Sequence, residues 1–287
     1  MTTLLQQTLN GLVGGAFYAL LALGLAVIFG VLRVINFAHG ALFMLGAFGA
    51  VALGHSGLGF WTALALVPIA VGVLGMILEW LFVRRLATSD RLYNFLLTFG
   101  IALVLQDLIR MKYGGQAQPY DRIPLNGQTD LGLFTFPTYQ LFVLAASVVA
   151  CLATWLLLTR TRAGVVVRAA TERPELARAY GINVARWVTP VFGFGCALAG
   201  LAGVLAAPMR AVTADMGGDL IVVIFAVVVI GGMGSVFGAV VAGFAIGAVQ
   251  AVGNLYVPAL SQVSVFALMA VVIMMRPVGL FGKEEHA

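Results

Sequence analysis

The sequence predicts an all-α integral membrane protein, a single polytopic helical bundle that includes residues 1–287. Three observations predict this class. Of all residues 62% are hydrophobic and only 9% are charged, whereas a soluble domain carries roughly 25% charged residues. Apolar runs of about 20 residues recur along the chain, the length that an α-helix needs to cross a bilayer. Glycines at four-residue spacing, as at Gly11 and Gly15, are typical of helices that pack closely in lipid.

Polar or charged residues divide the chain into about eight apolar runs that are long enough to span a membrane. We expect helices at about 9–32, 37–54, 60–83, 92–111, 138–159, 187–207, 236–252 and 259–275.

A ninth apolar run, 220–230, is too short to cross as a helix. Its eleven residues rise only about 16 Å, roughly half of a 30 Å hydrocarbon core. Gly231-Gly232-Met233-Gly234-Ser235 follows it. We expect the run either to be re-entrant or to be completed by irregular glycine backbone, which a membrane tolerates only beside protein or water. The bundle therefore has about eight or nine transmembrane helices, with broken or re-entrant segments.

A polar interruption, INFAHG at 35–40, separates the first two runs. Asn36 is a candidate N-cap for the second helix. His39 is either a residue of a transport path, because polar groups at membrane depth are costly and usually functional, or a satisfied side chain at an interfacial helix start. The candidates for a translocation path or gate are Asn36, His39, Gly231, Gly232 and Gly234.

The stretches 11–54 and 218–252 share an order of apolar run, break and glycine-rich run. Transporters commonly contain internal repeats, with the substrate near the broken helices. We therefore expect both breaks at the centre of the bundle, near a partner subunit. The alternative is general glycine richness, with both breaks as ordinary helix caps at the membrane surface.

The chain contains no motif for catalysis, nucleotide binding or metal binding. Its only lysines, Lys112 and Lys283, follow no GxxxxG pattern, and no HExxH, GxSxG or Cys/His cluster occurs. Cys151 and Cys196 lie in apolar runs, where small buried side chains are expected. The net charge of +5 comes from basic residues in a few loops, so no nucleic-acid surface is predicted.

The acidic residues are expected near helix ends or in loops. Glu79 falls in the last turn of its run close to Arg84, and Asp107 forms a predicted i, i+3 pair with Arg110 near the end of another run. A carrier coupled to protons or sodium usually places an acid in mid-membrane. A permease driven by a separate motor is therefore favoured. A stand-alone carrier or channel for small polar solutes is the alternative.

The arginine-rich segment 160–186 is too polar to cross a bilayer. Helix signals predict a short helix at about 172–180, with Thr171 as its cap, acids in its first turn and Gly181 after its end. A docking helix outside the membrane and a solvated interfacial loop both fit this composition.

The distribution of basic residues predicts the orientation. One side would hold the segment 160–186, Arg33, the loop 84–91 and the C-terminal tail, which leaves only Arg110, Lys112, Arg122 and Arg210 on the other side. The positive-inside rule then makes the arginine-rich side and the C-terminus cytoplasmic. The N-terminus is expected outside if all nine runs cross.

Three passages resemble the permease subunits of branched-chain amino acid ABC importers, the LivH type. They are NGLVGGAFYALLALGLAVIFGVLRVINFAHGALFMLGA (10–47), TRAGVVVRAATERPELARAYGINVARW (161–187) and VVVIGGMGSVFGAVVAGFAIG (227–247). The similarity runs over almost the whole length. The Arg173-Pro174 pair departs from the pattern that is usual after the RA-A stretch.

The resemblance implies an importer in the bacterial inner membrane. It would comprise two permease subunits, identical or paralogous, two cytoplasmic ATPases that hold ATP and Mg²⁺, and a periplasmic binding protein. This chain would hold no cofactor and catalyse no reaction. Family substrates include branched-chain amino acids, amides, urea and aromatic acids, so the substrate stays open. The resemblance also implies a coupling helix within 164–181, and the candidate ATPase-coupling residues are Gly164, Arg168, Ala169, Glu172, Glu175, Leu176, Ala179, Gly181 and Ile182.

Overall fold

The protein is an all-α polytopic helical bundle, as the sequence predicts. The computed structural model describes residues 2–86, 90–120, 123–130, 132, 134–172, 179–180, 183–258 and 261–282. Within these residues, seven helices are long and apolar enough to cross a membrane, and two shorter apolar helices accompany them.

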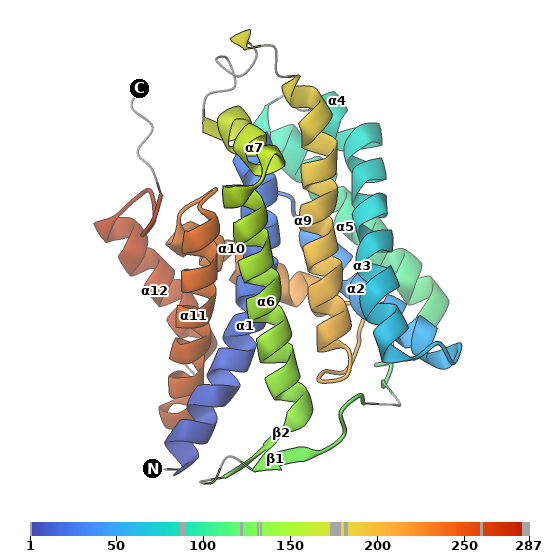
Figure 1. Ribbon diagram of the computed structural model, residues 1–287, viewed down its shortest axis with the longest axis vertical. Coiled ribbons are helices and arrows are strands. Elements are labelled where there is room, and N and C mark those ends of the chain that lie inside the picture. Colours follow the sequence, from blue (N-terminus) through green and yellow to red (C-terminus); the bar gives the residue numbers. More distant parts are fainter. Residues whose placement is uncertain are drawn as a thin grey trace.

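The long helices follow the predicted runs (Figure 1). They are α1 (Thr2–Leu32), α2 (Ala38–His55), α3 (Gly59–Leu78), α5 (Arg91–Tyr113), α6 (Thr138–Arg160), α9 (Val184–Ala206) and α11 (Val236–Tyr256). The shorter elements are the π-helix η1 (Glu79–Val83), the helices α4 (Arg84–Leu86), α7 (Arg162–Glu172), α10 (Met216–Gly231) and α12 (Ser261–Met275), and the antiparallel strands β1 (Gln128–Asp130) and β2 (Thr135–Pro137).

Helix α1 forms the centre of the bundle, and its residues from Ala19 to Leu23 are 0% exposed. It packs against α11 along a seam of small residues. A Cβ on Gly15 would lie 2.9 Å from the Cα of Phe244, and Gly243 faces the backbone of Ala19. Helices in lipid associate through such close backbone packing, so the glycine spacing in α1 predicts its partner surface correctly.

Helices α3 and α9 pack through a second seam of small residues. A Cβ on Gly75 would lie 2.5 Å from the sulfur of Cys196, which is 0% exposed. Cys151 is also buried, at 6% exposure. The prediction that both cysteines are small buried side chains is confirmed.

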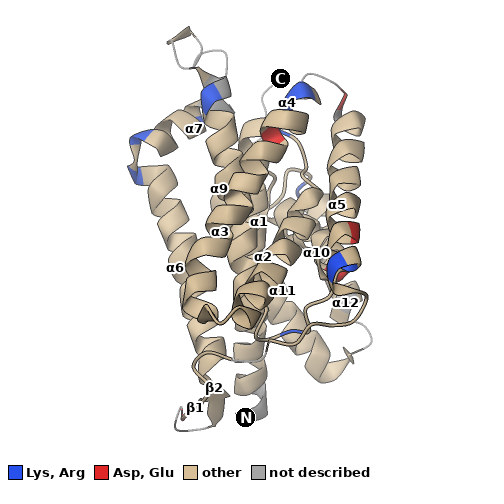
Figure 2. Ribbon diagram, turned by 90° about the vertical axis from the view of Figure 1, so that its right-hand side faces the viewer, with Lys and Arg blue, Asp and Glu red and all other residues tan. Residues whose placement is uncertain are grey.

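The bundle has two different ends. We call one the arginine-rich end; it holds α4, α7 and the turn between α10 and α11, and it lies at the top of Figure 1. The opposite end, the N-terminal end, holds the start of α1, the β1–β2 hairpin and the turn between α2 and α3. Charged residues gather at the arginine-rich end, with a further group at the lower end of α5 (Figure 2).

Candidate functional site

Helix α2 begins inside the bundle rather than at its surface. In its first turn, Nε2 of His39 lies 3.1 Å from the carbonyl oxygen of Leu21 in α1. Eleven residues of α1 follow Leu21, which corresponds to about 16 Å of helix. The chain from Arg33 to Phe37 therefore descends from the arginine-rich end without helical structure and reaches α2 at depth.

The polar groups at this helix start are buried, and only some of their atoms have a partner: Nδ2 of Asn36 and Nδ1 of His39 have none among the described residues. Asn36, 2% exposed, accepts the backbone N–H of Ala38 at 3.1 Å, and the hydroxyl of Thr98 accepts the N–H of Phe37 at 3.3 Å. His39 is 0% exposed. The N-cap of α2 is Phe37, so the prediction of Asn36 as the N-cap is off by one residue, although its side chain does accept from the first residue of the helix. The alternative interfacial position for His39 is wrong, because local polarity does not reveal the depth at which a helix starts.

Helix α10 begins at the same depth as α2. A Cβ on Gly217 would lie 2.6 Å from the carbonyl carbon of Gly40, so the two helix starts are in backbone contact. The 16 residues of α10 reach about 24 Å, and the residues 207–215 cover the remaining depth. The run 220–230 thus belongs to a span completed by irregular backbone, as one alternative predicted, but this backbone precedes the helix instead of following it.

The glycine break 231–235 lies at the arginine-rich end. A Cβ on Gly234 would be 3.6 Å from Gly30, near the end of α1, and the N–H groups of Leu280 and Phe281 donate to the carbonyls of Ile230 and Gly231 at 2.9 and 3.1 Å. The expectation that this break lies with Asn36–Gly40 at the centre is wrong. The first break instead contacts the start of α10. The similarity between 11–54 and 218–252 was therefore assigned to the wrong glycines.

The arginine-rich segment forms a helix earlier than predicted. Thr161 caps α7: its hydroxyl accepts the N–H of Gly164 at 3.1 Å, and its carbonyl accepts the N–H of Val165 at 3.0 Å. Gly164 packs against the carbonyl of Leu158, where a Cβ would clash with backbone. Thr171 lies inside α7, so its assignment as a cap is wrong. Either threonine could cap a helix with its side chain. The chain turns immediately before Gly164, so the helix starts after Thr161 and Thr161 is the cap.

Of the coupling candidates, those on α7 are described and most of the others are not. Gly164, Arg168, Ala169 and Glu172 belong to α7, and Ala179 is exposed just beyond it. Glu175, Leu176, Gly181 and Ile182 lie outside the described residues, as does most of the predicted helix 172–180.

Glu79 lies at the end of α3 and close to Arg84, as predicted, but it is fully buried. It begins the π-helix η1 with 0% exposure. The hydroxyl of Thr189 donates to Oε2 at 2.6 Å, and Nε of Arg84 lies 3.9 Å from Oε1. Burial of a carboxylate is costly without partners, so these contacts join α3 to α9 at the arginine-rich end.

The predicted pair of Asp107 and Arg110 is present, with a nitrogen–oxygen distance of 3.5 Å. Sequence analysis missed a third member. Nη2 of Arg110 lies 2.7 Å from Oδ1 of Asp215, which also accepts a hydrogen bond from Gln106. Asp215 stands just before α10, and Arg110 lies one turn before α5 ends at Tyr113, so the pair lies near the end of its helix, as predicted. Because 105 positions separate Arg110 from Asp215, local spacing carries no signal for the pair.

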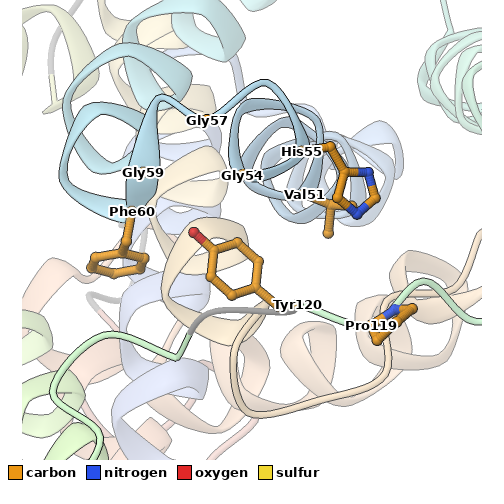
Figure 3. A pocket seen from close by; sticks show the side chains of 8 residues that line it. All are labelled: Val51, Gly54, His55, Gly57, Gly59, Phe60, Pro119 and Tyr120. Atoms are coloured by element: carbon orange, nitrogen blue, oxygen red, sulfur yellow. The ribbon is translucent and has the colours of Figure 1, made fainter.

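A cavity of about 500 Å³ opens at the N-terminal end. Its lining residues come from the α2–α3 turn and the segment 119–120, and Figure 3 shows the ring of Tyr120 between Phe60 and the end of α2. Partial burial raises the pKa of the Tyr120 hydroxyl, so it remains a neutral donor at physiological pH. Among the described residues, no group of three or more His, Cys, Asp or Glu could hold a metal ion.

These features define a class, the polytopic transport permeases, in which discontinuous helices meet at membrane depth. The family model described as "Branched-chain amino acid transport system / permease component" matches residues 7–275. The chain belongs to this family and is a transport permease component.

Named relatives agree with this assignment. The chain is 28% identical over 297 residues to the high-affinity branched-chain amino acid transport system permease protein LivH of Salmonella typhimurium, covering 98% of this chain and 96% of the relative. It is also 28% identical to BraD of Pseudomonas aeruginosa, with 98% and 96% coverage. A probable LivH of Methanocaldococcus jannaschii is 30% identical, with 79% and 74% coverage.

One solved structure shares the fold. PsaBC from Streptococcus pneumoniae in complex with Fab matches with a TM-score of 0.50 at 12% sequence identity, covering 93% of this chain and 89% of that chain. At this identity the likeness concerns the fold alone.

Proposed function

We propose that this chain is the membrane-spanning subunit of an ATP-driven importer for branched-chain amino acids or related small amides. The observation that carries the proposal is α7. This helix follows α6 after a turn at Thr161, lies at the arginine-rich end and contacts both α1 and α9. A permease without a nucleotide site needs a surface on which a separate ATPase acts, and a force on α7 would reach the central helix directly.

The arginine-rich end would face the cytoplasm, together with the C-terminus, because cytoplasmic loops carry an excess of Lys and Arg. The N-terminal end would then face outward in a bacterial inner membrane. Its cavity beside Tyr120 would lie where a binding protein delivers substrate.

The complete importer would contain a second permease copy or paralogue, two ATPases that supply ATP and Mg²⁺, and a periplasmic binding protein. The substrate class rests on the names of LivH and BraD, which are permease proteins of branched-chain amino acid transport systems. The coupling residues would lie in 164–181. Asn36 and His39 remain proposals for the gate.

The docking part is tested by co-purification of the ATPase with the permease from membranes. Leu176→Asp and Gly181→Pro are expected to abolish ATPase binding while the permease still inserts, because each disrupts the segment that follows α7. Lys112→Gln, a change at the opposite end of the bundle, is the control. Co-purification of the ATPase at wild-type yield with both variants would contradict a docking role.

The transport part is tested in proteoliposomes. The complex with both ATPases and the leucine-loaded binding protein is expected to accumulate leucine only when ATP is supplied. Liposomes that contain this chain alone are expected to accumulate none. Uptake by the chain alone would instead establish the stand-alone carrier or channel.

A further inference from the structure

Helices α3 and α9 are held together by close packing of small residues. A Cβ on Gly72 would lie 3.0 Å from the carbonyl oxygen of Gly193, and a Cβ on Gly75 would lie 2.5 Å from the sulfur of Cys196. Small residues let two helices approach closely, and such packing leaves no room for one helix to slide along the other. Along this seam, α3 and α9 therefore move as one body.

Both helices become irregular about one turn beyond the seam, towards the arginine-rich end. Helix α3 changes at Glu79 into the π-helix η1, and α9 contains Pro190, whose nitrogen cannot donate to the carbonyl of Arg186. Prolines and π-helical turns are the places where helices bend, and π-helical turns are frequent at functional sites. The two ends beyond them, residues 79–86 and 184–189, are thus joined to the seam through weakened turns.

One buried hydrogen bond joins these two ends. The hydroxyl of Thr189 donates to Oε2 of Glu79 at 2.6 Å, and Glu79 is 0% exposed. The other carboxylate oxygen, Oε1, has no hydrogen-bond partner among the described residues and lies 3.9 Å from Nε of Arg84. Loss of a hydrogen bond to a buried charge is costly. The bond to Thr189 therefore resists any separation of α9 from η1.

The position of α9 in the chain gives this bond a role in coupling. Helix α9 follows the segment 164–181, which the proposed function assigns to the ATPase, so a displacement of that segment acts first on residues 184–189. We propose that the Glu79–Thr189 hydrogen bond makes the end of α3 follow the end of α9. Both ends then move as one unit that bends at Glu79 and Pro190. This inference rests on the proposed function and assigns two positioning residues to it.

The first test is the number of leucine molecules accumulated per ATP hydrolysed by the complete importer in proteoliposomes. Thr189→Val removes the donor and is expected to lower this ratio about fivefold or more, while ATP hydrolysis continues. Thr189→Ser keeps the donor and is expected to keep the wild-type ratio. A variant that only unfolds more easily loses uptake and hydrolysis together, so its ratio does not change.

Thr154→Val is the matched control. Thr154 is also buried, at 2% exposure, but its hydroxyl donates to the carbonyl of Ala150 within α6 itself. The same substitution breaks no bond between helices there and is expected to keep the ratio. A wild-type ratio in Thr189→Val would overturn the assignment, provided that the wild-type importer couples uptake to ATP. A wild-type complex that accumulates no leucine would instead refute the proposed function itself.

The second test follows the movement without transport. Spin labels on introduced cysteines at Arg85 and Arg186, both exposed, report the two ends, and a label at Met233, 51% exposed in the turn between α10 and α11, is the reference. When the ATPase is trapped with nucleotide, the Arg85–Arg186 distance is expected to stay constant while both distances to Met233 change. In Thr189→Val the Arg85–Arg186 distance is expected to change as well. A constant Arg85–Met233 distance in the wild type would show that α3 does not follow α9, and would overturn the proposal.

Discussion

The two helices that start at mid-depth, α2 and α10, treat their polar groups in opposite ways. At the start of α2, Asn36 and His39 are 2% and 0% exposed and bond to backbone. At the start of α10, Asp215 is 60% exposed and bonds to side chains of α5. The two starts touch through Gly40 and Gly217, so their depth is the same and only their surroundings differ.

This difference separates polar groups that stabilise the fold of a membrane protein from polar groups that do not. A buried polar group with a backbone partner prevents an unsatisfied N–H or C=O in the bundle, and its loss costs stability. An exposed charge can be satisfied by solvent or by a neighbouring chain, so its loss should cost little stability. We therefore expect changes at the start of α2 to lower stability more than changes at the start of α10.

The largest effect is expected where the two helices touch. Gly217→Val would push a Cβ into the carbonyl of Gly40, a backbone contact that cannot rotate away, and is expected to cost about 3 kcal/mol. Gly218→Val, one residue further, meets no atom within 4 Å and is expected to leave thermal unfolding in nanodiscs unchanged. Equal destabilisation by both variants would mean that these helix starts are not in contact.

Thr189→Val tests a buried charge in the same way. Removal of its hydroxyl leaves the carboxylate of Glu79, 0% exposed, without its 2.6 Å donor. Hydrogen bonds to charged groups contribute roughly 1.5–3 kcal/mol, so the unfolding midpoint should fall clearly. The variant Thr189→Ser keeps the donor and should retain most of the stability. A stable Thr189→Val would show that Arg84 alone satisfies Glu79.

Asn36→Ala should destabilise the protein by about 1–3 kcal/mol, because it leaves the N–H of Ala38 unsatisfied. Asp219→Asn, at the exposed helix start, should not change the unfolding midpoint. Thermal unfolding of both variants in nanodiscs measures the comparison directly. If Asp219→Asn is the less stable of the two, polarity at α10 is structural and the contrast between the helices disappears.

The smallest effect is expected at α7, a helix start outside the bundle. Thr161→Ala removes the hydroxyl that accepts the N–H of Gly164 and should cost about 1 kcal/mol. Thr161→Ser keeps the acceptor and should match the wild type. Hydrogen exchange at the first turn of α7 would detect the loss; unchanged protection in Thr161→Ala would show that the cap does not hold this helix.

The sequence predicted the helices well and their depth poorly. Apolar length determines where α1, α3 and α6 can cross, so their bounds follow from composition. The descent from Arg33 to Phe37 could not be predicted, because a polar interruption looks the same at a membrane surface and at mid-depth.

The candidate site was predicted only in its local parts. Spacing within α5 indicates the pair of Asp107 and Arg110, and the polar residues before α2 indicate a cap. Neither pattern reaches Asp215, which tertiary packing alone brings to Arg110. The glycines at 231–234 were wrongly expected at the centre of the bundle. Gly232 and Gly234 have positive φ angles, 100° and 83°, because they form the tight turn between α10 and α11.

The glycine seam between α1 and α11 restricts which parts of the protein can move against each other. At Gly15 and Gly243 the two backbones touch without intervening side chains, so no rotamer change can accommodate sliding or rotation. The two helices must move as one rigid body. Only 11% of the apolar part of α5 is buried, against 83% of that of α1, so α5 lies at the edge of this core and presents most of its surface to lipid or to a partner. Any rearrangement between the helices of this bundle must therefore take place elsewhere than along the α1–α11 seam.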